Sequence, residues 1–382
     1  MPLNISYSAP HRIASKRNLA KALNIGDEEL EYLIAQKNHH YRQKRLPKKS
    51  GGTRTVYAPE RNLKALQRKI VARIFHLVRF PPYLQGSISD PENQRDYIKC
   101  ATQHCGAVAV SHIDIKNFFD GIEFDRVVDI FEGVFLFRSE VSLLLAELCT
   151  LDGYVPQGAP TSSYIANMIF FKDEPKIVNL ANKSGITYTR LVDDITISTD
   201  VKNTCLRTLT KKVIRMIESY DLEINADKTK SMIRGSVPLT VHGIRVVEKK
   251  PKISRDEYRN IRDAVHRVVL ASSTPNYRTK FEYFKLYHRV SGRLSKLKRL
   301  EHPGYTRLRN KLKPLLPLPS KGFKAKVTEK IEKLERNYSL SSSHEWYKKE
   351  WNVTSYKLGI VGRTYKKESS ELRARIKAIR PS

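Results

Sequence analysis

Three acidic residues stand in settings that solubility alone does not explain. Asp114 follows an apolar, β-branched run, and Asp193 and Asp194 stand side by side between two further β-rich runs. Adjacent carboxylates repel each other unless a cation neutralises them. Carboxylate oxygens suit Mg²⁺, and two such ions about 3.5–4 Å apart stabilise both oxygens of an in-line displacement at phosphorus. The acids therefore indicate metal-assisted chemistry on phosphates, although an Asp-Asp pair by itself is also common in plain turns.

The charge of the chain indicates a polyanionic partner. Its 382 residues include 70 lysines and arginines and 39 aspartates and glutamates, a net charge of +31, with 40% hydrophobic residues to form a core. So large an excess repels itself unless a polyanion is the usual companion, and nucleic acid is the leading one. Residues 291–382 contain 24 basic and 8 acidic residues, so about half of the excess lies there.

Other classes of protein fit the sequence poorly. No run of about 18 apolar residues is present and the N-terminus lacks the order of a signal peptide, so we expect a soluble, cytoplasmic protein without membrane contact. The four scattered cysteines do not form a disulfide framework. Cys100 and Cys105, with His104 between them, resemble half of a zinc site, but no second pair with suitable spacing follows.

Strands and helices must position the three acids. The alternating residues of 107–115 predict a strand that runs into Asp114, and 186–198 predicts two strands joined by a tight turn at Asp193 and Asp194. Apolar spacing predicts the other elements of this αβ core, which are helices over 63–78, 141–151, 162–171 and 202–220, a strand near 223–224 and a hairpin around 241–243.

The two ends of the chain are basic and largely helical. Helices are predicted over 15–25 and 28–36, and the stretch 37–54, with seven basic residues and no acid, predicts a basic hairpin. The pattern after residue 254 is helical. Three aromatic residues of the last segment are predicted to fill the core of a small helical subdomain rather than to stack on bases: Trp346, Tyr347 and Trp351.

Several motifs, in their order along the chain, resemble the palm motifs of reverse transcriptases, and most of all those of the bacterial retron branch. They are Asp114-Ile-Lys-Asn-Phe-Phe119, Val155-Pro-Gln-Gly-Ala-Pro-Thr-Ser162, Leu191-Val-Asp-Asp194, Asn225-Ala-Asp-Lys228 and Val241-His-Gly243. The fingers motifs are matched by Lys48-Lys-Ser-Gly-Gly-Thr-Arg54 and Leu63–Gln67, and the start of the thumb by Ser291–Leu294. Together, over roughly residues 19–315, these motifs are specific where each alone is weak.

The resemblance implies an α+β fold with right-hand polymerase architecture. Such a fold has fingers, an αβ palm that carries an antiparallel sheet, and a helical, basic thumb. The implied divisions are N-terminal helices and fingers at 1–105, palm at 106–250 with fingers helices inserted around 125–172, thumb at 251–318 and a basic C-terminal extension at 319–382.

The resemblance assigns the acids to an RNA-directed DNA polymerase, a nucleotidyltransferase that uses two Mg²⁺ ions. Asp114 and Asp193 would be the metal ligands proper, Ile115 would lie in the same metal site, and Asp194 would be the third catalytic carboxylate.

A second group of residues would bind the incoming dNTP. Phe119 matches the aromatic residue that excludes a 2′-hydroxyl by its size. It could instead lie in the core, but Phe118 is the better core candidate because neighbouring strand side chains alternate between faces. Gln157 and Gly158 match the loop beneath the nucleotide, where glycine permits close approach. The residues matched to the phosphates are Lys48, Arg54 and Lys228.

Primer and RNA are expected at Leu191, His242 and Gly243, and at Lys296 and Arg299 in the thumb, where side-chain charge would contact phosphates.

Three positions depart from the retron pattern. Leu191 stands where an aromatic residue usually opens the Asp-Asp turn. Cys100-Ala101-Thr-Gln-His104 keeps the Ala and His of the signature Asn-Ala-x-x-His but replaces its Asn, and Val241-His242-Gly243 replaces Val-Thr-Gly. We expect none of these changes to touch a metal ligand.

Enzymes of the retron type resemble one another in priming from a 2′-hydroxyl of their own folded RNA, which gives a branched RNA–DNA (msDNA), and in serving with an effector protein in anti-phage defence. The implied partners are a cognate non-coding RNA, its msDNA, dNTPs and an effector. Two alternatives stay open. One is a group II intron-type or other bacterial defence reverse transcriptase, although the chain is short for the former. The other is an RNA-binding scaffold with a secondary or inactive polymerase centre.

Overall fold

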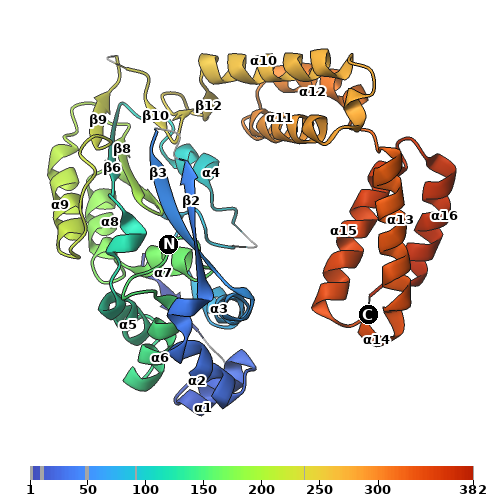
Figure 1. Ribbon diagram of the computed structural model, residues 1–382. Helices are drawn as coiled ribbons and strands as arrows, with labels where there is room; N and C mark the ends of the chain where they lie inside the picture. Colours follow the sequence, from blue (N-terminus) through green and yellow to red (C-terminus); the bar gives the residue numbers. More distant parts are fainter. Residues whose placement is uncertain (1–2, 9–12, 48–50, 91–92, 236, 382) are drawn as a thin grey trace. The chain divides into compact units, whose positions relative to one another are not determined.

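The computed structural model describes residues 3–8, 13–47, 51–90, 93–235 and 237–381 (Figure 1). Two compact units divide the chain, Met1–Lys252 and Ile253–Ser382, and each is described by itself. Helices and an antiparallel sheet both occur in the first unit, and helices alone make up the second beyond its first residues, so the predicted α+β class is confirmed.

A five-stranded sheet forms the centre of the first unit. Its strand order is β5 (Leu84–Gln85), β7 (Thr187–Leu191), β8 (Asp194–Thr199), β6 (Ala109–Asp114) and β9 (Lys230–Ile233). The central pairs are antiparallel and β5 pairs with β7 in parallel. The sequence predicts β6, β7 and β8 close to their observed bounds but misses β9. The strand predicted near 223–224 is wrong, because Ile224 forms only a single bridge with Ile115.

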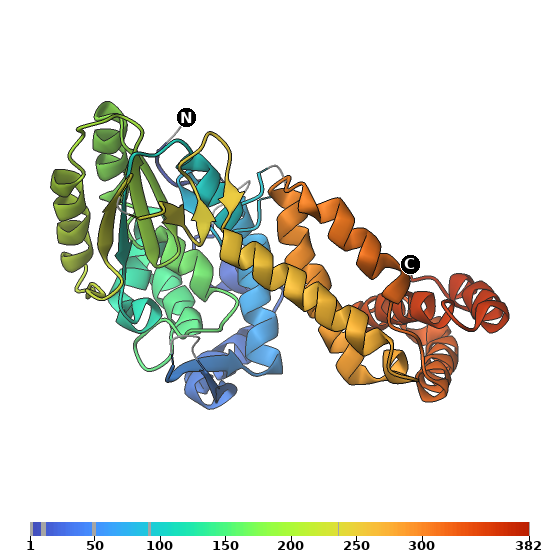
Figure 2. The same cartoon turned by 90° about the horizontal axis from the view of Figure 1, so that it is seen from above.

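Helices surround this sheet. In chain order they are α1 (Lys16–Leu23), α2 (Asp27–Ala35), α3 (Arg61–Arg73), α4 (Tyr97–Gln103), α5 (Phe124–Gly133), α6 (Ser139–Cys149), α7 (Ser162–Met168), α8 (Glu174–Lys183) and α9 (Arg207–Glu218). Figures 1 and 2 show α8 and α9 side by side along one face of the sheet. The buried residues of α9, Leu209, Val213, Met216 and Ile217, recur at helical spacing, so this helix presents one apolar stripe to the core.

Local chemistry explains several helix ends. The Ser15 hydroxyl accepts a hydrogen bond from the amide of Asn18 and so caps α1, and Asn24 ends that helix in a left-handed conformation. The helix predicted over 63–78 ends at Arg73, because the following residues enter a 3₁₀ turn and then β4 (Val78–Arg79), which pairs with β1 (Ser6–Tyr7).

Two hairpins complete the first unit. The predicted basic hairpin is formed by β2 (Tyr41–Pro47) and β3 (Thr53–Pro59), which pair in antiparallel register from Tyr41 opposite Pro59 to Pro47 opposite Thr53. The predicted hairpin around 241–243 is formed by β10 (Thr240–Val241) and β11 (Ile244–Arg245), with β12 (Lys252–Ile253) beside β11.

The second unit begins with three helices that contact one another, α10 (Arg255–Ser272), α11 (Phe281–Arg299) and α12 (Gly304–Leu312). Three further helices then pack together: α13 (Lys321–Arg336), α15 (Glu345–Val361) and α16 (Lys366–Ala378). The short helix α14 (Tyr338–Ser341) lies between α13 and α15 in the sequence.

The aromatic residues of α15 test the prediction of a small helical core. Tyr347 is fully buried and its hydroxyl donates to the carbonyl of Ile379, while the indole N–H of Trp351 donates to the carbonyl of Ile376. Both residues belong to the core of the bundle or pack against it, as predicted. Trp346 is 43% exposed, so for this residue the prediction is wrong.

No helix in the described parts of the chain is both long and apolar enough to cross a bilayer.

Candidate active site

The three acids come together at one end of the central strands. Asp114 and Asp194 are opposite partners in the register of β6 and β8. Asp193 lies in the turn before β8, and its carbonyl accepts a hydrogen bond from the amide of Ile115 at 3.0 Å. Val192 in the same turn has φ of 62°, a left-handed value that is unfavourable for a β-branched residue. The fold thus maintains a strained turn in order to place these carboxylates side by side.

The electrostatics of the site favour a cation. Burial raises the pKa of Asp193, and the nearby charges of Asp114 and Asp194 raise it further. The ammonium of Lys228 lies 3.0 Å and 3.2 Å from the two carboxylate oxygens of Asp114. Lys228 is 62% exposed whereas Asp114 is 14% exposed, so the lysine can move while the acid is held in place.

A hollow of about 290 Å³ opens over these groups. Asp114, Asp194, Lys228, His242 and Gly243 line it together with residues that the sequence analysis did not single out, namely His112, Asp227, Lys230 and Thr240.

The donor set fits a hard divalent cation. In the part of the chain that the structure describes, no three His, Cys, Asp or Glu side chains already stand as a formed metal centre. Even so, the carboxylate oxygens suit such an ion, and the raised pKa of Asp193 shows that the site favours additional positive charge beside the one that Lys228 supplies to Asp114. Asp114, Asp193 and Asp194 would hold the ion, and Ile115 lies beside them.

Phe118 and Phe119 differ in exposure as predicted, but for another reason. Phe118 is buried and stacks on Phe170, while Phe119 is only partly buried. Both lie in a 3₁₀ turn, Phe118–Gly121, that follows the left-handed Asn117. The alternation expected for a strand therefore does not apply, and the turn sets the direction of each ring.

The loop with Gln157 and Gly158 lies against the basic hairpin. The amide of Tyr57 on β3 donates to the carbonyl of Gln157 at 2.8 Å. Gly158 has φ of 118°, and a Cβ there would come within 3.0 Å of the Tyr57 carbonyl oxygen. Glycine is thus required at this position by the hairpin itself. Arg54 is exposed on the same strand, and Lys48 lies outside the described residues.

Leu191 and the turn of the β10–β11 hairpin lie next to the acids. Leu191 ends β7 directly opposite Asp194, and it packs so closely on Gly86 that a Cβ there would come within 2.4 Å of Leu191 Cδ1. His242 and Gly243 form the two-residue turn, and Nδ1 of His242 lies 3.3 Å from Oδ2 of Asp194. The expectation that the departures from the retron pattern avoid the catalytic acids is therefore wrong for His242.

The contacts of His242 determine the pKa of its imidazole. Burial alone would lower its pKa, but the hydrogen bonds to Asp194 and Cys100 outweigh burial and raise the pKa to about 10.

Ala101 in α4 and His104, the residue that directly follows α4, support the fold. Both are buried. The two ring nitrogens of His104 lie 2.7 Å from the hydroxyls of Ser198 on β8 and Thr189 on β7. Burial lowers the pKa of His104 to about 3, which keeps the ring neutral, so one nitrogen donates and the other accepts. His104 thereby connects β7 and β8, the two strands that flank the turn with Asp193.

Lys296 and Arg299, both predicted to contact phosphates, differ in their surroundings. Lys296 is 13% exposed and its ammonium contacts both carboxylate oxygens of Glu257 on α10, at 2.6 Å and 2.8 Å. The prediction that Lys296 contacts phosphates is therefore corrected, because its charge is already neutralised between two helices. Arg299 lies in the exposed last turn of α11, and its phosphate contact stays a prediction.

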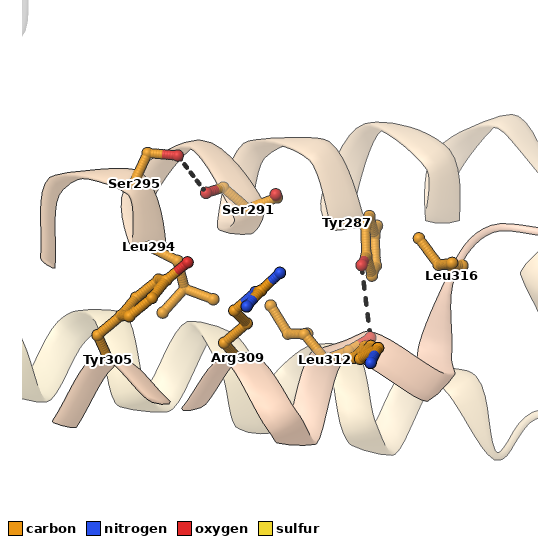
Figure 3. A pocket seen from close by; sticks show the side chains of 9 residues that line it. Tyr287, Ser291, Leu294, Ser295, Tyr305, Arg309, Leu312 and Leu316 are labelled. Carbon is orange, nitrogen blue, oxygen red and sulfur yellow. Dashed lines mark hydrogen bonds between the residues drawn. The ribbon is translucent and has the colours of Figure 1, made fainter. Parts of the chain in front are cut away.

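A groove of about 250 Å³ between α11 and α12 holds other cations (Figure 3). Arg309 projects from α12 toward α11, and Lys313 follows one turn later. Neither has an acidic partner among the described residues. Ser291 and Tyr305 add hydroxyl groups to the same groove.

A buried ion pair that was not predicted from the sequence lies next to the turn at Val192 and Asp193. The guanidinium of Arg190 on β7 contacts both oxygens of Glu174 on α8, at 2.6 Å and 2.7 Å, and both residues are fully buried. Arg190 also donates to the carbonyls of Ala166, Asn167 and Val192. The available sign was a charged residue inside an apolar strand, since a buried charge requires a partner.

We expect Arg190→Met to lower the free energy of unfolding by about 3–5 kcal/mol, because Glu174 would remain as an uncompensated buried charge. Urea unfolding measures this loss. The matched control is Arg190→Met with Glu174→Leu, which removes both charges and should recover part of the stability. Equal losses in the single and double variants would contradict the argument.

Known proteins with similar sequences are reverse transcriptases. Residues 46–261 match the family described as reverse transcriptase (RNA-dependent DNA polymerase). A retron Ec48 reverse transcriptase from Escherichia coli is 37% identical over 380 residues, which cover 97% of this chain and 93% of that protein. A retron Se72 reverse transcriptase from Salmonella heidelberg (strain 579083-10) is 32% identical over 374 residues, with 97% of each chain covered. A retron Ec86 reverse transcriptase from Escherichia coli is 31% identical over 269 residues, with 67% of this chain and 79% of that protein covered.

Proposed function

This chain belongs to the retron reverse transcriptases, the premise on which we propose that it copies a cognate, structured non-coding RNA into a branched RNA–DNA molecule. Its activity as an RNA-directed DNA polymerase follows from the family. The observation that carries the proposal is the placement of Asp114, Asp193 and Asp194 at one end of β6 and β8. A scaffold that only binds RNA has no use for this arrangement.

In the proposed mechanism the three carboxylates would hold two Mg²⁺ ions, in keeping with the use of divalent metal ions by this family. When bound, the metal stabilises the negative charge that develops on the attacking and leaving oxygens. Lys228 neutralises Asp114 before substrate arrives. Because its side chain is mostly exposed, Lys228 can then turn to the triphosphate and donate a proton or a hydrogen bond to the leaving pyrophosphate.

The incoming dNTP is enclosed by two segments that already contact each other. The Gln157–Gly158 loop lies below it, and the basic hairpin supplies Arg54 for the phosphates. Phe119, which follows Asp114 by five residues and is only partly buried, would fill the space that a 2′-hydroxyl needs. We keep the division into fingers (1–105), palm (106–250), thumb (251–318) and C-terminal extension (319–382) as part of the proposal.

Partners complete the proposal. DNA synthesis begins at a 2′-hydroxyl of the cognate RNA, the msDNA stays associated with the protein, and an effector protein joins them in anti-phage defence. The support is similarity to retron reverse transcriptases over nearly the whole chain, together with a net charge of +31 that suits a permanent nucleic-acid partner.

A reaction without added primer tests the priming step. It contains the purified protein, the RNA transcribed from the region beside its gene, labelled dNTPs and Mg²⁺. Without any added primer, label should join the RNA and move with it in a denaturing gel. If label appears only when a DNA primer is annealed, the priming proposal fails while the polymerase assignment stands.

Arg309 and Lys313, the two basic residues of the α11–α12 groove, are expected to contribute to the salt dependence of nucleic-acid binding. Charge reversal by Arg309→Glu with Lys313→Glu should reduce the slope of log affinity against log salt by about two units, if each side chain neutralises one phosphate. Titration of an RNA–DNA duplex at several salt concentrations measures the slope. Lys211→Glu with Lys212→Glu on the exposed face of α9 is the control with the same change in charge. Equal slopes in the two double variants would place the duplex elsewhere.

A further inference from the structure

Two residues that depart from the retron pattern, Cys100 and His242, touch each other in the folded chain. They lie 142 positions apart, yet Sγ of Cys100 and Nε2 of His242 are 3.3 Å apart. The other ring nitrogen of His242, Nδ1, lies 3.3 Å from Oδ2 of Asp194. A thiol, an imidazole and a catalytic carboxylate therefore form one line of contacts, with the ring in the middle.

The backbone of His242 forms a tight turn, and its side chain is packed inward. His242 and Gly243 form a two-residue turn in which both φ angles are positive, 48° and 75°. Such turns favour Asn or Asp before Gly, and histidine is also among the side chains that adopt the left-handed conformation more often than most. The imidazole is 9% exposed, so it is packed inward against Asp194 rather than left in solvent.

The line of contacts continues into the strands behind the catalytic turn. Sγ of Cys100 lies 3.1 Å from the hydroxyl of Thr189 on β7, and this hydroxyl also contacts His104. His104 in turn contacts Ser198 on β8. Because β7 and β8 flank the turn that carries Asp193, the His242 ring is fixed from behind by the same framework that positions the acids.

We propose that His242 is a positioning residue which, supported by Cys100, holds Oδ2 of Asp194 and so fixes the orientation of this carboxylate in the site. The other oxygen, Oδ1, is buried without a hydrogen-bond partner and lies 3.9 Å from Nδ1 of His112, so the contact with His242 is the shorter of the two imidazole contacts to this carboxylate. This inference rests on the proposed catalytic role of Asp194, and it gives His242 a role other than the primer contact predicted from the sequence. Groups that orient the carboxylate ligands of a metal act in this way, and losing one costs about 10–100-fold in metal affinity or activity.

Two substitutions separate the contact from the shape of the turn. His242→Gly keeps the left-handed turn and removes the ring, while His242→Asn keeps the turn and offers an amide N–H to Asp194. We expect kcat of His242→Gly to fall about 10–100-fold, with the KM for dNTP and the affinity for template–primer within about twofold of the wild type. His242→Asn should retain most of kcat.

Outcomes of that comparison are decisive. Equal losses in the Gly and Asn variants, or a full kcat in the Gly variant, would overturn the proposal. A loss confined to template–primer affinity would overturn the proposal and support the primer contact predicted for His242 from the sequence. The activity of the wild-type protein on an RNA template tests the proposed function separately, so a failure there is not confused with a failure here.

The role of Cys100 is tested by combining variants. Because Cys100 acts through His242, Cys100→Ala should lower kcat in the wild type but add little to His242→Gly. Additive losses would show that Cys100 acts independently.

A second measurement needs neither metal nor turnover. The ring ¹⁵N signals of His242 in the metal-free protein, assigned by their loss in His242→Asn, should shift on Asp194→Asn. They should shift much less on Asp114→Asn, the matched carboxylate on the facing strand. Equal shifts in the two variants would contradict direct contact with Asp194.

Discussion

DNA synthesis on an RNA template should fall about a thousandfold or more in the double variant Asp193→Asn with Asp194→Asn, since the loss of metal ligation forfeits roughly 4 kcal/mol or more of transition-state stabilisation. The amides keep the size of the side chains but remove the negative charges that burial and Asp114 make costly. We therefore expect the unfolding temperature to stay the same or rise. Primer extension with dNTPs and Mg²⁺ measures the activity.

The control for this variant is Asp221→Asn, which removes a surface carboxylate paired with Arg126 and lies away from the site. It should extend primers at the wild-type rate. RNA binding should be unchanged in both variants, because neither alters the basic surfaces. Substantial extension by the double variant would show that the reaction does not depend on these acids.

The second large effect concerns the choice of sugar. Phe119→Val should raise the incorporation of ribonucleotides relative to deoxyribonucleotides by about 10–200-fold, the range that pocket size alone can discriminate. The Phe119 ring is only partly buried in the turn that follows β6, whereas Phe118 packs against Phe170. Incorporation of rNTP and dNTP at matched concentrations gives the ratio.

Phe118→Val is the matched control for Phe119→Val. It should lower the stability of the protein, because it leaves a cavity in the core, without changing the sugar ratio. If the ratio is unchanged in Phe119→Val, the ring belongs to the core and sugar selection lies elsewhere.

Local patterns in the sequence were sufficient to predict that Asp114, Asp193 and Asp194 come together. A strand that ends in Asp114 and a tight turn at Asp193 define their own geometry, because antiparallel pairing then places Asp114 opposite Asp194. The same holds for the basic hairpin, whose strands β2 and β3 are neighbours in the sequence and pair with each other. The confirmed parts of the fold are those that depend on short-range spacing.

What the sequence did not reveal depends on contacts between distant segments. Arg190 and Glu174 pair across a strand and a helix, and Cys100 meets His242 only after the sheet has formed. Lys296 carried the expected charge on the expected helix, yet Glu257 on the neighbouring helix neutralises it. Periodicity gives the face of a helix but not the partner that lies opposite, so these assignments required the structure.

The most direct test of the central claim is the nucleic acid that co-purifies with the protein when it is expressed together with the genomic region beside its gene. We predict that the wild-type protein carries DNA covalently joined to RNA, so that RNase shortens the species and leaves a DNase-sensitive strand with residual ribonucleotides. The variant Asp193→Asn with Asp194→Asn should carry the RNA alone. Wild-type protein that carries RNA without DNA, or a variant that carries the same DNA, would contradict the account.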